Sequence, residues 1–420
     1  MKSILIALLL LAGCAQTRTS QEAPKLSSIH IIDREGMTEA ISNPERLKLY
    51  ETVNFCNPQP YQKVLRVYSR DASGNMFSYI TTYHSNGQLR QYLEVVNNRA
   101  CGDYREWHSN GQLKVSASVV EGIGDISLAA EKSWVFDGDS SAYDECGRLL
   151  AVIRYCRGSL EGVSTYYHKN GSVWKEIPYA NNALCGDFRI YYDSGCLLQS
   201  TYYVNGNKEG VSMRYWPGDQ IAVTETYKNN LLLEGSYYSL GGQPVCSIAN
   251  GEGTKALFGK ADVSELHEVR HGVEEGSVQI FDEEGNTHAV FQVKNGLKQG
   301  EEVRFYSKKL NKEPQRKLSI NWYQGKIQGV VKTWYESGTM ESQKEMSDNK
   351  RNGVSTAWYK DGQLMMIEEY DQGKIKKGDY FRKGDRRPIS QIVNSEGTAT
   401  LYDSDGNFVR KIEYVHGKPI

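Results

Sequence analysis

The sequence predicts an all-β protein in which tandem β-hairpins of about 24 residues form an extended, twisted antiparallel sheet, after a short mixed N-terminal segment. The first observation is a fixed spacing, because Gly138, Gly162, Gly186 and Gly210 lie 24 residues apart. The second is a further glycine nine residues after most opening glycines, where a turn is expected. The third is composition, since 40 Gly, 28 Tyr and only 10 Pro in 420 residues favour a β-repeat array over separate globular domains.

The clearest unit covers residues 353–377 and reads GVSTAWYKDGQLMMIEEYDQGKIKK. Alternating residues run to Asp361-Gly362, a second alternating run reaches Tyr370, and Gln372-Gly373 reverses the chain again. Asp-Gly between two alternating runs predicts a hairpin with a type I′ turn, which needs positive φ at both central residues.

Three positions repeat when each unit is counted from its opening glycine as position zero. Position five is aromatic, position eleven is mostly aliphatic and position seventeen is usually Tyr, as in Trp358, Leu364 and Tyr370. Side chains alternate between the two faces of a strand, so these odd positions are expected to share one face. We therefore predict that the three ladders form the core of the sheet.

Aromatic residues at even positions would then lie on the opposite face of the sheet. They are the predicted candidates for an exposed strip that binds a partner. These residues are Tyr166, Tyr192, Trp216, Tyr335 and Tyr359.

Residues 1–13 have the pattern of a lipoprotein signal peptide. Lys2 gives a positive start, residues 4–11 form an apolar run too short to span a bilayer as a finished helix, and Leu-Ala-Gly precedes Cys14. This pattern resembles a bacterial lipobox, which implies cleavage before Cys14 and lipid attachment to its sulfur. The alternative is an ordinary secretory signal in which the cysteine is incidental.

The rest of the chain divides into five predicted segments. They are a tether at 14–27, an N-terminal segment at 28–77, a first repeat block at 78–240, an irregular insertion at 241–275 and a second repeat block at 276–420. The N-terminal segment is expected to hold a strand at 28–33 and a short helix within 43–53. Residues 241–275 are a hinge, a side excursion or a degenerate repeat, and residues 116–134 and 308–316 are smaller departures from the spacing.

Charge and cysteine content exclude several classes of site. The net charge of −1 provides no basic field for nucleic acid. Seven cysteines follow Cys14, and an odd number in an exported chain leaves at least one thiol outside an internal disulfide. They form no Cys-x-x-Cys pair, which argues against a zinc ribbon or a thioredoxin-like site.

One short stretch matches a catalytic pattern. His267, Glu268 and His271 form H-E-x-x-H, in which two helical imidazoles bind zinc and the glutamate acts as base. The repeat spacing instead aligns residues 267–271 with a strand that runs into a turn, and Gly272 with turn residue Gly296. We therefore expect no catalytic residues, no metal site and no cofactor, with zinc binding at this stretch as the weaker alternative.

The units resemble the MORN-repeat variant found in many bacterial exported proteins and lipoproteins. The pattern is G-x-x-x-x-[YW]-x-x-[ND]-G-x-[LV], seen in residues 102–113 and 353–364, and the resemblance covers most of residues 78–420. Part of that family consists of YwqK-type antitoxins, which implies binding of another protein. An exported lipoprotein fits poorly with neutralising a cytosolic toxin.

The sequence thus predicts a non-enzymatic protein of the bacterial cell envelope, anchored by lipid at the outer membrane. Its repeat surface is expected to bind a protein, an envelope polymer or a host surface, and not nucleic acid. The alternatives are a zinc metalloenzyme at the H-E-x-x-H stretch, a module that contacts lipid headgroups, and an antitoxin-like binding protein.

Overall fold

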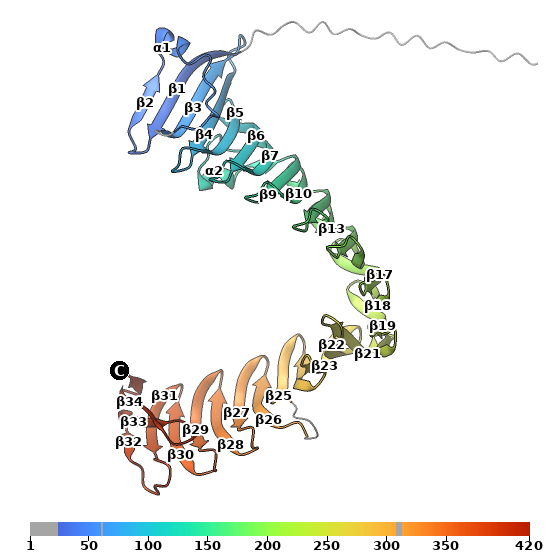
Figure 1. The fold of residues 1–420 in the computed structure, drawn as a ribbon, viewed down its shortest axis with the longest axis vertical. Coiled ribbons are helices and arrows are strands. Elements are labelled where there is room, and N and C mark those ends of the chain that lie inside the picture. The colour runs from blue at the N-terminus through green and yellow to red at the C-terminus, as the bar shows by residue number, and fades with distance from the viewer. Residues whose placement is uncertain (1–23, 60–61, 308–312) are drawn as a thin grey trace, which may run out of the picture. The chain divides into compact units, whose positions relative to one another are not determined.

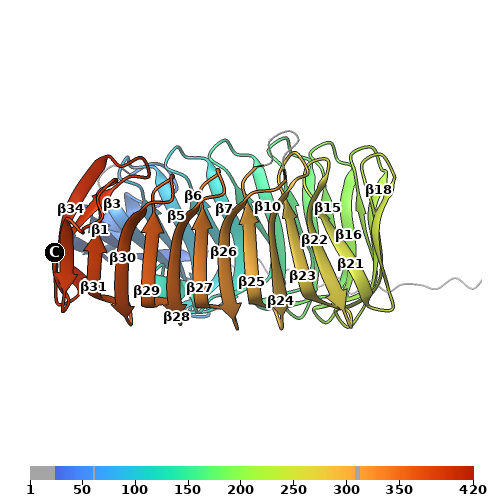
Figure 2. The same cartoon turned by 90° about the horizontal axis from the view of Figure 1, so that it is seen from below.

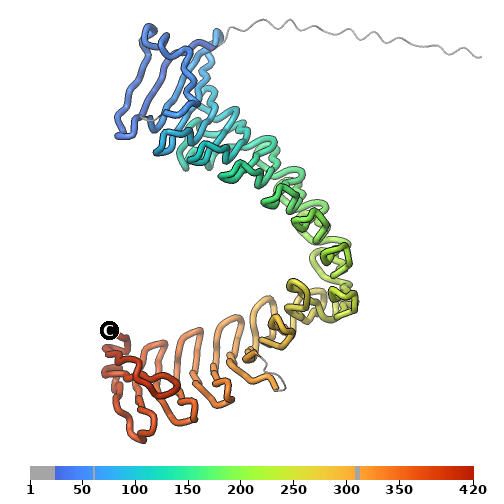
Figure 3. Tube along the Cα trace, viewed as in Figure 1, coloured from blue at the N-terminus to red at the C-terminus, as the bar shows by residue number. Residues whose placement is uncertain are grey.

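The structure is a computed structural model that describes residues 24–59, 62–307 and 313–420. In these ranges the strands pair antiparallel, mostly with their neighbours in sequence, as the ribbons in Figures 1 and 2 and the Cα trace in Figure 3 show. The all-β prediction is confirmed. The chain divides into two compact units, residues 1–195 (unit 1) and 196–420 (unit 2), which are described separately.

The N-terminal segment belongs to the same sheet as the first repeats. β1 (Lys25–Asp33) pairs with β2 (Thr38–Ile41) and with β3 (Gln62–Arg70), and β3 pairs with β4 (Met76–Tyr83). The predicted strand at 28–33 is confirmed, but β1 begins inside the segment predicted as a tether. The tether up to residue 23, the signal peptide and Cys14 lie outside the described residues.

The predicted helix is present but short. α1 covers Pro44–Lys48, because Asn43 caps it: its Oδ1 accepts hydrogen bonds from the Glu45 and Arg46 amides at 2.9 and 3.2 Å. Pro44 occupies the first turn, where its missing N–H costs nothing.

The remaining elements of unit 1 are β5 (Leu89–Val96), β6 (Arg99–Trp107), β7 (Leu113–Glu121), α2 (Leu128–Glu131), β8 (Val135–Phe136), β9 (Gly138–Tyr143), β10 (Leu149–Cys156), β11 (Ser159–Leu160), β12 (Gly162–Tyr167), β13 (Val173–Ala180), β14 (Ala183–Leu184) and β15 (Gly186–Tyr191). Those of unit 2 are β16 (Leu197–Val204), β17 (Asn207–Tyr215), β18 (Ile221–Lys228), β19 (Leu231–Tyr238), β20 (Pro244–Ala249), β21 (Glu252–Phe258), β22 (Val263–Arg270), β23 (Val273–Phe281), β24 (Thr287–Lys294), β25 (Leu297–Phe305), β26 (Arg316–Tyr323), β27 (Lys326–Trp334), β28 (Met340–Ser347), β29 (Lys350–Trp358), β30 (Leu364–Asp371), β31 (Lys374–Tyr380), β32 (Ser390–Val393), β33 (Glu396–Tyr402), β34 (Phe408–Val415) and β35 (Lys418–Pro419).

Two kinds of turn alternate along the repeats. Gln372 and Gly373 have φ of 46° and 85°, which is the type I′ geometry. At Asp361-Gly362 only Gly362 is in the left-handed region, at 83°, and the Tyr359 amide donates to the Gln363 carbonyl at 2.8 Å. The type I′ prediction is therefore wrong for Asp361-Gly362, where a longer turn needs one glycine.

The register of each hairpin sets the two faces of the sheet. Trp358 at position five lies opposite Leu364 at position eleven, whereas Ala357 lies opposite Met366. Met365 is therefore an extra residue in the second strand, and such a bulge reverses the alternation beyond it. Positions five and eleven share one face, which we call the outer face.

Position seventeen lies on the other face, which we call the inner face, opposite the opening glycine, as in Tyr370 and Gly353. The prediction that all three ladders share one face is therefore wrong. The inner face also contains position two, which is the most regularly buried position of the repeat. Its buried residues are Ile80, Tyr104, Ser164, Ser212, Val278, Glu302, Ser355 and Ala399.

The even-position aromatics predicted as an exposed strip include the most buried rings of the repeats. Trp216 and Tyr359 are only 2% and 0% exposed, so the prediction is wrong for these two, whereas Tyr166, Tyr192 and Tyr335 are partly exposed. These residues bridge to the next hairpin: the Tyr335 and Tyr359 hydroxyls donate to the Trp358 and Phe381 carbonyls at 2.7 Å. In unit 1 the ring of His168 makes the same contact with the Tyr191 carbonyl at 3.0 Å.

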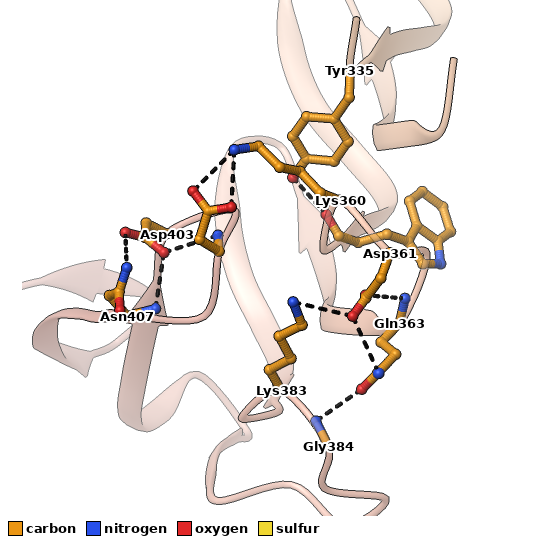
Figure 4. Close-up of polar contacts among 10 residues, drawn as sticks. Tyr335, Lys360, Asp361, Gln363, Lys383, Gly384, Asp403 and Asn407 are labelled. Carbon is orange, nitrogen blue, oxygen red and sulfur yellow. Dashed lines mark hydrogen bonds and ion pairs between the residues drawn. The ribbon is translucent and has the colours of Figure 1, made fainter. Parts of the chain in front are cut away.

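Neighbouring turns are also joined to one another, as Figure 4 shows for the last repeats. The Gly384 amide donates to the Gln363 side-chain oxygen at 2.8 Å. Lys383 pairs with Asp361 at 3.1 Å, and Lys360 pairs with Asp405 at 2.9 Å. Since these ion pairs are exposed, each contributes only about 0–1 kcal/mol, and their main effect is to fix the spacing of the turns.

Both faces of the first repeats in unit 1 are covered. Residues 43–59 lie on the outer face, where Leu47 and Phe55 join one core with Tyr83 and Leu89. The stretched segment at 116–134 covers the inner face, where the Trp134 ring lies 4.9 Å from the Tyr104 ring. The predicted departure at 116–134 is therefore a cover for the core.

Residues 241–275 have the strand pairing expected of the degenerate repeat, one of the three alternatives that the sequence left open. β20, β21 and β22 continue the antiparallel pairing, and Gly235 lies opposite Ile248 while Gly253 lies opposite Val269. The same arrangement recurs at the C-terminal end, where Gly378 lies opposite Ile392 and Gly397 lies opposite Tyr414. We call these two regions the first and second closing modules, residues 208–274 and 351–419.

Each closing module has a buried carboxylate held by two tyrosines. Glu225 accepts hydrogen bonds from Tyr237 and Tyr227 at 2.7 and 2.8 Å. Its counterpart Glu368 accepts them from Tyr380 and Tyr370 at 2.8 and 3.1 Å. Burial raises the pKa of these tyrosines, so their hydroxyls stay protonated and act as donors.

Removing one of these donors tests the packing of the module. Tyr380 is 1% exposed, so Tyr380→Phe leaves a buried carboxylate oxygen without its partner, and we expect a loss of about 1–3 kcal/mol in the free energy of unfolding. Urea denaturation followed by circular dichroism measures it. The control is Tyr402→Phe on the outer face, for which we expect a change within about 0.5 kcal/mol. Equal effects of the two substitutions would contradict the account.

Candidate functional site

Within each unit the outer face carries side-chain pairs, most of which join an aromatic residue to an aliphatic one. In each pair the aromatic residue at position five lies directly opposite the residue at position eleven on the next strand. We call these pairs the outer stripe: Trp107–Leu113, Tyr143–Leu149 and Tyr167–Val173 in unit 1, and Tyr215–Ile221, Phe281–Thr287, Trp334–Met340, Trp358–Leu364 and Tyr402–Phe408 in unit 2.

The outer stripe is open to solvent over much of its length. Its aromatic side chains are partly exposed, and Ile221 and Phe408 reach 39% and 60% exposure. Successive pairs are two strands apart in unit 1 and between Trp334 and Trp358, so those rings recur about every 10 Å, whereas the other pairs of unit 2 are four or six strands apart. Position one widens the apolar surface, because Val211 and Val354 are 52% and 45% exposed.

The first repeat shows what a covered stripe looks like. Tyr83 and Leu89 occupy positions five and eleven there, but they are only 6% and 7% exposed. Residues 43–59 lie over them, and the Tyr83 hydroxyl donates to the Phe55 carbonyl at 2.7 Å. An apolar chain segment with an available carbonyl therefore fits the stripe, and the later pairs offer the same chemistry without such a cover.

The sequence prediction placed the wrong aromatic residues on the surface. Position five was expected in the core because one face of a sheet is usually buried. The sheet is a single layer, however, and the described covering segments lie over the first repeats. The bulge at Met365 is the physical reason that position seventeen, and not position five, joins the buried face.

The H-E-x-x-H stretch does not form a zinc site in the structure. His267 and Glu268 lie on β22, whereas His271 has φ of 53° and forms the type I′ turn with Gly272. The expectation of a strand that runs into a turn is confirmed. Both ring nitrogens of His267 form hydrogen bonds, with the Glu274 and Glu265 carboxylates at 2.9 and 2.8 Å. The side chain of His271 is 91% exposed.

Glu268 is not poised to act as a base. Hydrogen bonds from the Ser277 amide and from Arg270 lower its pKa, which stabilises the carboxylate. In the ranges that the structure describes, no group of three or more His, Cys, Asp or Glu side chains is placed to hold a metal ion.

His267 and Glu274 form a hydrogen-bonded pair in which each group shifts the pKa of the other. The hydrogen bond to Glu274 raises the pKa of His267, with a smaller contribution from Glu265. In turn, His267 and then Lys255 lower the pKa of Glu274 to about 2. Lys255 and Glu274 line a cavity in the first closing module, and His267 is not among its lining residues.

Two further sequence features concern export. No disulfide joins the seven cysteines within the described part of the chain, and burial raises the pKa of Cys246 to about 11. Among the described helices, neither has the length and apolar character needed to cross a bilayer.

The fold defines a β-hairpin repeat protein with partly exposed aromatic residues on one face of its sheet. The MORN repeat variant family matches residues 160–181, 327–348 and 351–372, so the chain contains repeats of this variant. The resemblance noted in the sequence is confirmed for these segments. No curated protein matches the chain.

The His267 contacts make stability depend on pH. Because the folded-state pKa of His267 is raised above 6.5, its contribution is fully present below that value and is lost as pH rises through the folded pKa. We expect His267→Gln to lower the free energy of unfolding more at about pH 5.5 than at about pH 8.5. Urea denaturation at both values measures this.

The control for this prediction is His271→Gln at the type I′ turn. Gln324 and Gln372 occupy equivalent turn positions with positive φ, so glutamine is tolerated there. We expect the same small effect at both pH values. A pH-independent effect of His267→Gln would contradict the assignment of the charged pair.

Proposed function

We propose that this protein is a non-enzymatic, lipid-anchored protein of the bacterial cell envelope, at the outer membrane, whose outer stripe binds a protein partner. The observation that carries the proposal is the contrast between the covered Tyr83–Leu89 pair and the partly exposed pairs of later repeats. The chain itself supplies a protein segment for the first pair, so a protein segment is the ligand that this chemistry favours.

The side chains of the outer stripe favour a protein as the binding partner over a charged polymer. Aromatic and aliphatic side chains gain free energy mainly by removing apolar surface from water, and such residues dominate protein interfaces. The net charge of −1 offers little long-range attraction for a polyanion or an anionic membrane surface. Where pairs are two strands apart, as in unit 1 and between Trp334 and Trp358, an extended partner can make the same contact more than once, which raises affinity through avidity.

The lipid anchor rests on the sequence alone. Leu-Ala-Gly before Cys14 supports lipid attachment at that sulfur, and stable anchoring needs more than one acyl chain. A protein held in this way would present its repeats at the membrane surface to partners in the envelope.

Site-specific photocrosslinking in intact cells tests the outer stripe. A photoreactive phenylalanine analogue at Trp358 is expected to give one discrete adduct, because the residue is partly exposed within the stripe. Trp334→Ala in the same protein is expected to lower the adduct yield by about tenfold, since aromatic residues are frequent hot spots.

Tyr323 is the matched control, because it is an exposed aromatic residue, at 57%, away from the stripe. The analogue at Tyr323 is expected to give no adduct. Adducts of equal yield at Tyr323 and Trp358, or none at Trp358, would contradict the proposed surface.

Cys14→Ala tests the anchor separately. We expect the variant to lose metabolic labelling with palmitate and to move from the membrane fraction to the soluble fraction. Cell fractionation followed by immunoblotting measures the second effect. Persistence of the variant in salt-washed membranes would show that another part of the chain provides the attachment.

A further inference from the structure

The two closing modules allow an internal comparison, because they have the same strand register and the same buried Glu–Tyr–Tyr contacts. Lys255 and His267 are opposite one another in the first module, where the second module has Ala399 and Ile412. Glu274 occupies the place of Pro419. The second module thus shows that the fold forms with apolar residues at these positions.

Lys208, at the start of the first closing module, also differs from its counterpart in the second module in the contacts that it makes. Lys208 corresponds to Arg351, since each lies two residues before an opening glycine and is followed by the same hairpin. Arg351 donates to the Tyr370 hydroxyl at 2.7 Å and lies 3.5 Å from Glu368. Both cations lie over the ring of the corresponding tyrosine, Lys208 Nζ at 4.6 Å from the centre of Tyr227 and Arg351 at 5.0 Å from that of Tyr370. Lys208 differs in that it forms neither the hydrogen bond to the hydroxyl nor the ion pair that Arg351 forms.

Lys208 and Lys255 line one cavity of about 310 Å³ in the first module. Among the described residues, no carboxylate lies within ion-pair distance of Lys208, and burial followed by the nearby Lys255 lowers the pKa of Lys208. Lys255 is 17% exposed and pairs with Glu274 at 2.7 Å. Among the residues that line the cavity, two ammonium groups lie with one carboxylate, Glu274, and the buried Glu225, bonded to the Tyr227 hydroxyl, also acts on Lys208. A carboxylate bound by both ammonium groups would be stabilised in this partly desolvated site.

The remaining residues that line the cavity indicate which chemical group is attached to the anion. Leu232, Val269 and Val273 give the cavity an apolar wall, and the Tyr227 ring closes one side. We propose that this cavity binds a carboxylate attached to a small branched aliphatic group, with Lys208 and Lys255 pairing the carboxylate. Such a group occurs as a free short-chain carboxylate or as the C-terminal residue of a peptide. The site is separate from the outer stripe and does not depend on the proposed protein partner.

Titration calorimetry with the full exported chain tests the site. Isovalerate represents the free carboxylate and N-acetylglycyl-leucine represents the peptide C-terminus, and the tighter of the two identifies the source. We expect at least one of them to bind, whereas isovaleramide and the amide of the dipeptide do not, because they lack the charge. Absence of heat with either carboxylate up to about 20 mM would overturn the proposal, since weaker binding would not be specific.

Substitutions then assign the binding to the cavity. Lys208→Met and Lys255→Ala are each expected to weaken binding at least tenfold, and the second introduces the residue that the second module already has. The control is Lys344→Met, at a half-buried lysine whose pKa is also lowered by burial and which lies outside the cavity. We expect it to change affinity less than twofold.

Circular dichroism of each variant shows whether the sheet is retained. Unchanged affinity in both cavity variants, equal loss in Lys344→Met, or binding of inorganic phosphate in preference to both carboxylates would each overturn the proposal.

Discussion

The extra residue in the second strand of each hairpin is the constraint on which the structure depends. Met365 is one example, and it turns Tyr370 to the inner face while Trp358 and Leu364 remain on the outer face. Each hairpin therefore presents two different surfaces. The inner surface buries position two and the Glu–Tyr contacts, whereas the outer surface keeps its aromatic residues partly exposed.

A single-layered sheet needs other segments to complete a core. Unit 1 uses residues 43–59 and the segment around Trp134 for this purpose, and unit 2 uses its closing modules. The two modules conserve Glu225 and Glu368 with their tyrosines but differ at Lys255 and Ala399. The buried glutamate is thus common to both closing modules, whereas Lys255 is found only in the first of the two.

The sequence pattern predicted the hairpins but not the faces. Fixed glycine spacing identified the repeats, and alignment of Gly272 with Gly296 placed His271 in a turn, because turn chemistry is local. The alternation of faces mispredicted Tyr370 because nothing local marks the bulge, and it mispredicted Tyr359 because that residue follows the end of β29 and lies in the turn. For residues 241–275 the sequence left a hinge, a side excursion and a degenerate repeat open. Their likeness to the C-terminal module lies about 143 residues away and becomes clear only from the register.

The assignment of the two faces is tested most directly by hydroxyl-radical footprinting of the purified protein with mass spectrometry. Trp358 and Tyr402 on the outer stripe are predicted to be oxidised much faster than Tyr359 and Tyr380, which are 0% and 1% exposed. Faster oxidation of Tyr359 and Tyr380 than of Trp358 and Tyr402 would contradict the account, because it would place the stripe in the core.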